Sequence, residues 1–353
     1  MQLEPMLRIL LEDPYPEKEI VVCIDEPTQA SERLVASLEE KVRFFVSRER
    51  KGKVAALNTA VKETNSDILL FLDSDLELHQ QGFLSLVADE MNRFDIIEIK
   101  KKIIRDSFIA RIVNYDYLSA NFANLLFSRY LGQCLGINGA AFAIRREAMG
   151  KIGGFDREIC EDLGIAMKAY LKRLRFGYAE GIEVHNKVDS SWKVWFKQRK
   201  RWGIGLGLWL RRYYKQLIGS IIKHPIVVLS ALLIIFPSLP LIMTIFAVPD
   251  HFYVSVVSFI LLFLASKQLL VVPPMTAFLI GVAFTQFLTM SLIFFAGFAI
   301  IFYYFSKRLG YAFNLLEFVF FFYVYNPLWL LISIASFLRV LIWRNGFNLD
   351  WKV

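Results

Sequence analysis

The chain has 353 residues, 56% of them hydrophobic, and a formal net charge of +8. This apolar fraction exceeds what the core of a soluble domain requires, so part of the chain is expected to lie in lipid. Phe and Leu dominate the C-terminal part, whereas charged residues and glycines are mixed normally before it. The composition therefore excludes a wholly soluble protein, and it predicts a soluble domain at residues 1–215 and a membrane domain at residues 216–353.

The boundary between the two regions is strongly basic. It carries eight cations and no acid, namely Lys193, Lys197, Arg199, Lys200, Arg201, Arg211, Arg212 and Lys215. A basic run before a membrane span is typical of the cytoplasmic face, and it also attracts anionic lipid headgroups. We therefore expect a multi-pass protein of the cell membrane with a cytoplasmic soluble domain, in contact with membrane lipids and with no nucleic acid partner.

Strands and helices are predicted to alternate through the soluble domain. The expected order is a helix at 3–11, a strand at 19–24, a helix at 31–41, a strand at 42–46, a helix at 53–64 and a strand at 67–72. The strands contain almost no polar residues, which favours an α/β fold with a mostly parallel sheet covered on both faces. A later helix at 107–133 fits either an ordinary surface helix or one in the membrane interface.

Four apolar stretches in the membrane domain are long enough to cross a bilayer, which needs roughly 20 apolar residues per helix. They lie near residues 226–248, 252–272, 276–303 and 312–335. The loop charges support this number only in part, so three spans or a re-entrant second stretch stay open. The C-terminal tail is expected either to continue the last helix or to lie along the interface.

Two acids follow the predicted strand at residues 67–72, in the sequence Asp73-Ser74-Asp75. Ligands of such sheets bind beyond the carboxyl ends of the strands, and two carboxylates there repel each other unless a cation lies between them. Mg²⁺ or Mn²⁺ held by carboxylates and substrate phosphates satisfies both requirements. We therefore predict metal ligation by Asp73 and Asp75, and we include His185 as a further candidate ligand.

Three other positions are candidates for substrate binding or catalysis. Lys53 follows Gly52 where a helix begins, so its ammonium and the nearby N–H groups suit a phosphate. Asp25 ends the first predicted strand, where it is either a nucleoside contact or a turn residue. Glu161-Asp162 opens a helix, and the acids either complement the helix dipole or supply a base that takes a proton from an attacking hydroxyl.

A third motif, Gln198-Arg199-Lys200-Arg201-Trp202, lies directly before the membrane domain. An indole beside planar cations suits stacking against the apolar face of a sugar. Anchoring of Trp202 at the membrane interface is the competing interpretation.

Taken together, these motifs resemble membrane-integrated glycosyltransferase family 2, in particular the branch of cellulose, chitin and hyaluronan synthases. The resemblance runs from about Leu3 to Trp202. It is carried by Asp25, Gly52-Lys53-Val54-Ala55-Ala56-Leu57-Asn58, Asp73-Ser74-Asp75, Gly136-Ile137-Asn138-Gly139 with Arg145-Arg146, Gly153-Gly154-Phe155, Glu161-Asp162 and Gln198-Arg199-Lys200-Arg201-Trp202.

This resemblance implies a GT-A type, Rossmann-like fold and a metal-dependent, inverting transfer from a nucleotide-sugar, expected to be a UDP-sugar, to a growing glycan or lipid-linked acceptor. Asp25 and Asp73 would contact the nucleoside, Lys53 the diphosphate and Asp75 the Mg²⁺ or Mn²⁺. Asp162, beside Glu161, would be the general base. The acceptor side would be formed by Gln198, Arg201 and Trp202.

One departure from the family pattern concerns the beginning of the fold. Family members start with a central strand that grips the nucleotide, and Met1 falls at the helix after it. Without that strand, two neighbouring strands would keep unpaired backbone groups. The alternatives to a chain-extending enzyme are a polyprenyl-phosphate sugar synthase that makes a single transfer and a non-catalytic membrane transporter or scaffold.

Overall fold

The structure, a computed structural model, describes residues 3–247, 257, 259–261, 263–267 and 274–342. The chain forms two compact units. One comprises Met1–Ile234 with Leu331–Val353, and the other is Ile235–Leu330. All the predicted site residues belong to the first unit.

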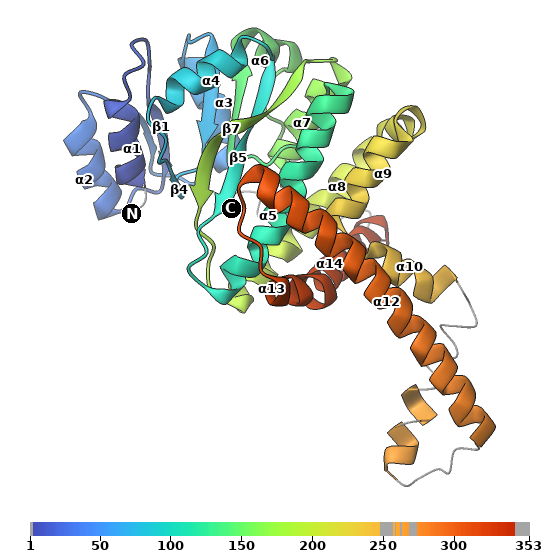
Figure 1. Cartoon of the computed structure of the whole chain (residues 1–353). Coiled ribbons are helices and arrows are strands. Elements are labelled where there is room, and N and C mark those ends of the chain that lie inside the picture. Colours follow the sequence, from blue (N-terminus) through green and yellow to red (C-terminus); the bar gives the residue numbers. More distant parts are fainter. Residues whose placement is uncertain (1–2, 248–256, 258, 262, 268–273, 343–353) are drawn as a thin grey trace. The chain divides into compact units, whose positions relative to one another are not determined.

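The first unit begins with alternating helices and strands, as predicted. They are α1 (Leu3–Glu12), β1 (Val21–Asp25), α2 (Gln29–Leu38), β2 (Arg43–Ser47) and α3 (Lys53–Glu63). β1 and β2 pair in parallel, with Val21 opposite Arg43 and Asp25 opposite Ser47. In Figure 1 the blue elements α1, α2 and β1 lie together at one end of this unit.

A second, five-stranded sheet has the order β3-β6-β5-β7-β4. Its strands are β3 (Ile68–Leu72), β4 (Leu76–Glu77), β5 (Ile96–Ile103), β6 (Ala141–Arg145) and β7 (Phe176–Asn186). Only β5 and β7 pair in parallel, and the other three pairings are antiparallel. The sheet is therefore mixed, and the expectation of mostly parallel strands was wrong. Unbroken apolar strands indicate burial of both faces but not the direction in which a neighbouring strand runs.

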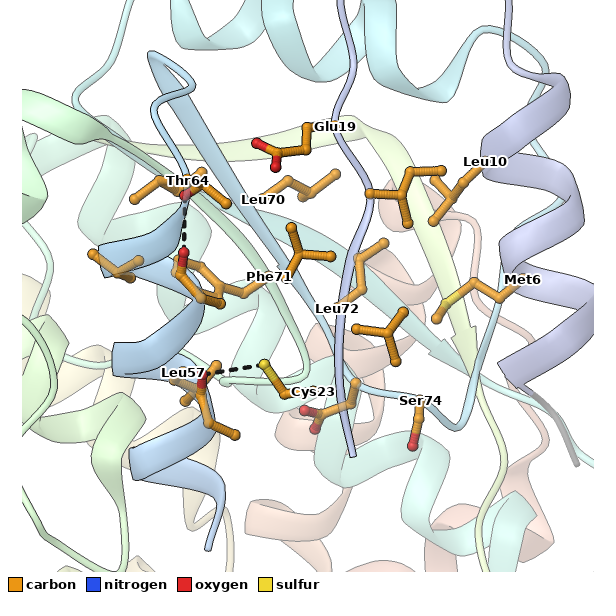
Figure 2. Close-up of a pocket in the computed structure, with 18 of the residues that line it drawn as sticks. Met6, Leu10, Glu19, Cys23, Leu57, Thr64, Leu70, Phe71, Leu72 and Ser74 are labelled. Atoms are coloured by element: carbon orange, nitrogen blue, oxygen red, sulfur yellow. Dashed lines mark hydrogen bonds between the residues drawn. The ribbon is translucent and has the colours of Figure 1, made fainter. Parts of the chain in front are cut away.

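The two sheets are not joined by a β-ladder between β1 and β3. A cavity of about 1510 Å³ lies between these strands, and both of them line it along their length. Figure 2 shows Met6 and Leu10 of α1 on one side of this cavity, and Leu57 of α3 with Thr64, which directly follows α3, on the other. The edges of β1 and β3 that face each other thus border open space rather than another described strand.

Helices cover the five-stranded sheet. They are α4 (Phe83–Met91), α5 (Phe108–Leu126), α6 (Arg146–Ile152) and α7 (Glu161–Leu171). α5 packs on β5 and buries most of its residues, including the polar Asn114, Asn121 and Asn124. The interpretation of this segment as a surface or interfacial helix was therefore wrong. Its arginine and asparagines gave it a polar pattern, but the asparagines serve interior hydrogen bonds.

The remaining helices lie in the C-terminal part of the chain. They are α8 (Trp192–Lys223), α9 (Pro225–Ile235), α10 (Leu239–Ala247), α12 (Pro274–Leu309), α13 (Leu315–Phe320) and α14 (Asn326–Ile342). Within the described residues, two helical segments are long and apolar enough to cross a membrane, Phe284–Leu309 and Leu315–Ile342. The pair α8 and α9, bent by 115°, would make a third. Four spans were expected, and the predicted stretch at 252–272 lies largely outside the described residues.

Candidate active site

The large cavity reaches the carboxyl ends of β1 and β3, where the predicted polar residues gather. Its lining includes the side chains of Asp25, Lys53, Asp73, Asp75, Glu161 and Asp162. These residues come from four separate elements or from the turns that follow them: β1, α3, β3 and α7. The structure thus brings the acids and the lysine selected from sequence into a single cleft.

Lys53 lies between two of these acids. Its Nζ is 2.8 Å from Asp73 Oδ1 and 3.1 Å from Glu161 Oε1. Burial by itself lowers the pKa of Lys53, but the two carboxylates outweigh burial and hold its pKa above the usual range. The side chain is therefore a cation held between the carboxylates of Asp73 and Glu161.

Asp25 shapes the loop that leads to Lys53. Its Oδ2 accepts hydrogen bonds from the backbone N–H groups of Lys51, at 3.0 Å, and Gly52, at 2.6 Å. Gly52 has φ of 86°, a left-handed conformation that favours glycine, and α3 begins at the next residue. The contact seen here is therefore with the Lys51-Gly52 backbone at the N-terminus of α3.

Asp73 and Asp75 fit a divalent cation by their charge. Burial, followed by the negative charge of Asp73, raises the pKa of Asp75 above the usual range. A bound cation would relieve both effects. Among the residues that the structure describes, no three His, Cys, Asp or Glu side chains are grouped closely enough to hold a metal ion. Two neighbouring carboxylates suit Mg²⁺ or Mn²⁺, which take few protein carboxylates and complete their shell with phosphate and water.

Asp162 is held by two backbone groups at the start of α7. Its Oδ2 accepts from the N–H of Gly139 at 2.9 Å, and its Oδ1 accepts from the N–H of Leu163 at 2.8 Å. The neighbouring Glu161 has its pKa raised by burial and then by the charge of Asp162. The carboxylate of Asp162 is thus fixed in orientation and retains lone pairs for another donor.

A second, smaller cavity has a volume of about 250 Å³. Asp75 lines both this cavity and the large one. Gln198 and Trp202, two of the predicted acceptor residues, are also in its lining. Residues outside the predicted acceptor set complete it, among them Tyr117, Asn186, Asp189, Trp195 and Arg199.

Arg199, rather than the predicted Arg201, faces this smaller cavity. Arg201 lines neither cavity. The buried guanidinium of Arg199 lies 2.6 Å from Asp116 Oδ2 on α5 and 4.5 Å from the ring centre of Trp202. Trp195, Arg199 and Trp202 are spaced i, i+4 and i+7 on α8, so helical periodicity could have found this face.

His185 does not join the two aspartates. It lies on β7, lines neither cavity, and its ring centre is 4.7 Å from that of His79. Its Nε2 is 3.9 Å from Glu183 Oε1, and burial followed by the charge of His79 lowers its pKa. The structure therefore gives no geometric basis for His185 as a ligand beside Asp73 and Asp75.

Other motif residues hold the framework together. The side-chain amide of Asn58 on α3 donates to Phe155 O and accepts from Phe155 N, both at 2.9 Å. Arg146 donates to Ser66 O at 2.7 Å and to Val61 O at 3.2 Å. The turn at Phe155 is therefore bonded to α3, and Arg146, which directly follows β6, is bonded to α3 and to the residues before β3.

Similarity to known proteins agrees with this arrangement. The probable glycosyltransferase YdaM of Bacillus subtilis (strain 168) is 25% identical over 209 residues, which cover 54% of this chain and 49% of that protein. The poly-beta-1,6-N-acetyl-D-glucosamine synthase of Staphylococcus aureus (strain COL) is 24% identical over 209 residues, covering 58% of this chain and 51% of the synthase. The chain thus spans about half the length of these curated relatives.

A solved structure shares the fold. The mannosyltransferase PcManGT from Pyrobaculum calidifontis, in complex with GDP-Man and Mn²⁺, matches with a TM-score of 0.53 at 15% identity, covering 98% of this chain and 84% of that one. This likeness confirms the GT-A type fold. Residues 68–349 match the profile of Glycosyl transferase family group 2. The chain therefore belongs to glycosyltransferase family 2.

Proposed function

We propose that this chain moves a sugar, with inversion, from a UDP-sugar to a growing glycan or a lipid-linked acceptor at the cytoplasmic face of the cell membrane. Mg²⁺ or Mn²⁺ is the proposed cofactor. The donor binds in the large cavity and the acceptor enters through the smaller one.

The observation that carries this proposal is the position of Asp75, which lines both cavities. A transferase must bring the bond that breaks in the donor next to the hydroxyl that attacks it. The carboxylate shared by the two cavities marks the place where the two substrates meet.

Each charged residue of the cleft has a part in the proposed reaction. Lys53 leaves Asp73 and Glu161 for the diphosphate, which draws the donor to the N-terminus of α3. Asp162 takes the proton of the acceptor hydroxyl as that oxygen attacks the anomeric carbon, and the nucleoside diphosphate departs. A divalent cation held by Asp73 and Asp75 would neutralise the charge of the leaving diphosphate.

The long helix α8 suits a position at the membrane surface. Basic side chains at Lys193, Lys197, Lys200 and Lys215 are exposed, and so are apolar ones at Phe196 and Ile222. Amphipathic helices with this combination lie in the interface of anionic membranes. The smaller cavity, which is lined from this helix, would then open near the lipid, where a lipid-linked or growing acceptor is held.

The proposal is tested with the full chain in nanodiscs containing anionic lipid, given UDP-sugars singly with Mn²⁺ or Mg²⁺. Release of UDP and transfer of radiolabel are measured, with GDP-mannose included because the PcManGT complex contains it. We expect metal-dependent turnover that Asp75→Asn and Asp162→Asn each abolish. Turnover that survives either substitution contradicts the assigned roles, and label found only in organic-extractable monosaccharide lipid selects the polyprenyl-phosphate alternative.

A further inference from the structure

A buried ion pair lies on β5, beneath the cleft. Lys101 Nζ is 2.9 Å from Glu98 Oε1, and each side chain is only 1% exposed. Neither residue lines either cavity. Burying two charges is costly unless every remaining hydrogen-bonding group is satisfied, so the other partners of the pair indicate what it does.

The second carboxylate oxygen of Glu98 reaches the turn that precedes β6. Glu98 Oε2 accepts from the backbone N–H of Asn138 at 3.3 Å and from Asn124 Nδ2 of α5 at 2.6 Å. The carboxylate therefore ties the turn at Asn138 to α5 and to β5 at once.

The same turn is bonded to two acids of the cleft, the proposed base Asp162 and the proposed metal ligand Asp73. Gly139 N–H donates to Asp162 Oδ2 at 2.9 Å, and Asp73 N–H donates to Ala140 O at 2.8 Å. A displacement of Asn138 would also move the next two residues, Gly139 and Ala140, and through them Asp162 and Asp73. The turn of residues 138–140 thus sets the separation between the proposed base and the proposed diphosphate site.

Lys101 is itself fixed in place. Asn121 of α5 donates its Nδ2 to Lys101 O at 2.9 Å and accepts from Lys101 N at 3.4 Å. Lys101 Nζ also donates to Ile99 O at 3.0 Å. The ammonium is therefore held on Glu98, whose pKa is raised by burial and lowered in turn by the charge of Lys101.

We propose that Glu98, neutralised by Lys101, is a positioning residue that fixes the turn of residues 138–140 and thereby aims Asp162 at the acceptor. This inference rests on the proposed function, because it assigns Glu98 a task only if Asp162 is the base. Glu98 touches no substrate and acts through Asn138 and Gly139.

The test compares two double variants of the full chain. Glu98→Leu with Lys101→Met removes both charges and the bond to Asn138, and it is expected to fold because apolar replacement of a buried pair is often neutral. Glu98→Gln with Lys101→Met also removes both charges but keeps an acceptor oxygen for Asn138 N–H. Asp95→Asn is the matched control, since Asp95 directly precedes β5 and pairs with Arg175, whose side chain is 61% exposed.

Two measurements are made on each protein. Hydrogen–deuterium exchange of the peptide that contains residues 138–140 reports the turn itself, and steady-state kinetics reports turnover. For Glu98→Leu/Lys101→Met we expect faster exchange and a kcat lower by about 100-fold, with the donor KM changed little, because small misplacements of a reacting group cost this much. Glu98→Gln/Lys101→Met should restore most of the slow exchange and most of the wild-type kcat. Asp95→Asn should match the wild type in both measurements.

Unchanged exchange in Glu98→Leu/Lys101→Met overturns the inference, whatever the turnover. Faster exchange with wild-type kcat overturns it too, since the turn would then not aim the base. The inference is also contradicted if kcat and the folded fraction fall together in both double variants, with no recovery in the variant that carries Gln. The pair would then serve only to stabilise the fold. Failure of the proposed function is separate, because it appears as full turnover in Asp162→Asn, a variant in which Glu98 is intact.

Discussion

Asp162 and Gly139 are in direct contact. The backbone N–H of Gly139 donates to Asp162 Oδ2 at 2.9 Å, and a Cβ atom added to Gly139 would lie 2.8 Å from Asp162 Cβ. A glycine is therefore required at this point of the turn by close approach of the neighbouring carboxylate, not by its own backbone angles.

Gly139→Ala should impair catalysis far more than folding. The new methyl group has to displace Asp162, so we expect kcat to fall by on the order of 100-fold and the free energy of unfolding by about 1–3 kcal/mol. Turnover and thermal unfolding are measured side by side. Gly150→Ala is the control, because a Cβ there meets no atom within 4 Å. Since Gly150 lies within α6, that change should stabilise the chain by about 0.5–1 kcal/mol and spare turnover.

Wild-type kcat in Gly139→Ala would contradict the assignment of Asp162 as the base. Loss of turnover in Gly150→Ala would indicate that the assay reports general damage to the fold.

Activity should decrease as the pH falls below neutrality. The decrease should begin at a higher pH than it would for carboxylates with ordinary pKa values. Burial and the charge of a neighbouring acid raise the pKa values of Asp75 and Glu161. As the pH falls through these raised values, the acids take up protons and lose their hold on the metal ion and on Lys53. The measurement is kcat/KM against pH at two Mn²⁺ concentrations.

Metal and protons compete for the same oxygens, so the higher Mn²⁺ concentration should move the acidic limb to lower pH. If the acidic limb stays at the same pH at both Mn²⁺ concentrations, the titrating group is not a metal ligand. Asp95, whose pKa is lowered mainly by Arg175, offers Asp95→Asn as a control that should leave the limb unmoved.

The buried Arg199 should matter for both stability and acceptor binding. Its side chain is 3% exposed and that of Asp116 is 12% exposed. Arg199→Met removes the guanidinium that lies 2.6 Å from Asp116 Oδ2, and the free energy of unfolding should fall by about 3 kcal/mol. The acceptor KM should rise while the donor KM holds, because Arg199 supports Trp202 in the smaller cavity.

Asp116→Leu combined with Arg199→Met separates the two effects. Stability should largely return, since both charges of this pair are removed together, while the acceptor KM stays high. Arg201→Met is the matched comparison on the same helix, and a larger rise in acceptor KM there would restore the sequence-based assignment of Arg201.

The metal requirement should depend on the aspartates and not on His185. His185→Ala is expected to keep the wild-type Mn²⁺ activation curve, because His185 lines neither cavity. Asp73→Asn should raise the half-activating Mn²⁺ concentration by at least about tenfold, in keeping with the loss of a charged ligand. A weakened Mn²⁺ response in His185→Ala would place that ring in the metal site after all.

The sequence alone determined the class of chemistry and the local elements that carry it. An apolar strand followed by Asp73-Ser74-Asp75, a glycine before Lys53 and acids at the start of a helix are local patterns. Each pattern depends on hydrogen bonds and charge interactions among residues that are close together in the sequence. For this reason α3, β3 and α7 lie close to where they were predicted.

Tertiary structure decided which side chains meet. Strand direction in the mixed sheet, the burial of α5 and the choice of Arg199 over Arg201 depend on partners distant in the chain, such as Asp116. The pair of Glu98 and Lys101 resembles a surface salt bridge in sequence, yet its side chains are 1% exposed. Burial depends on what packs above a residue, and for this pair the covering helix α5 comes later in the chain.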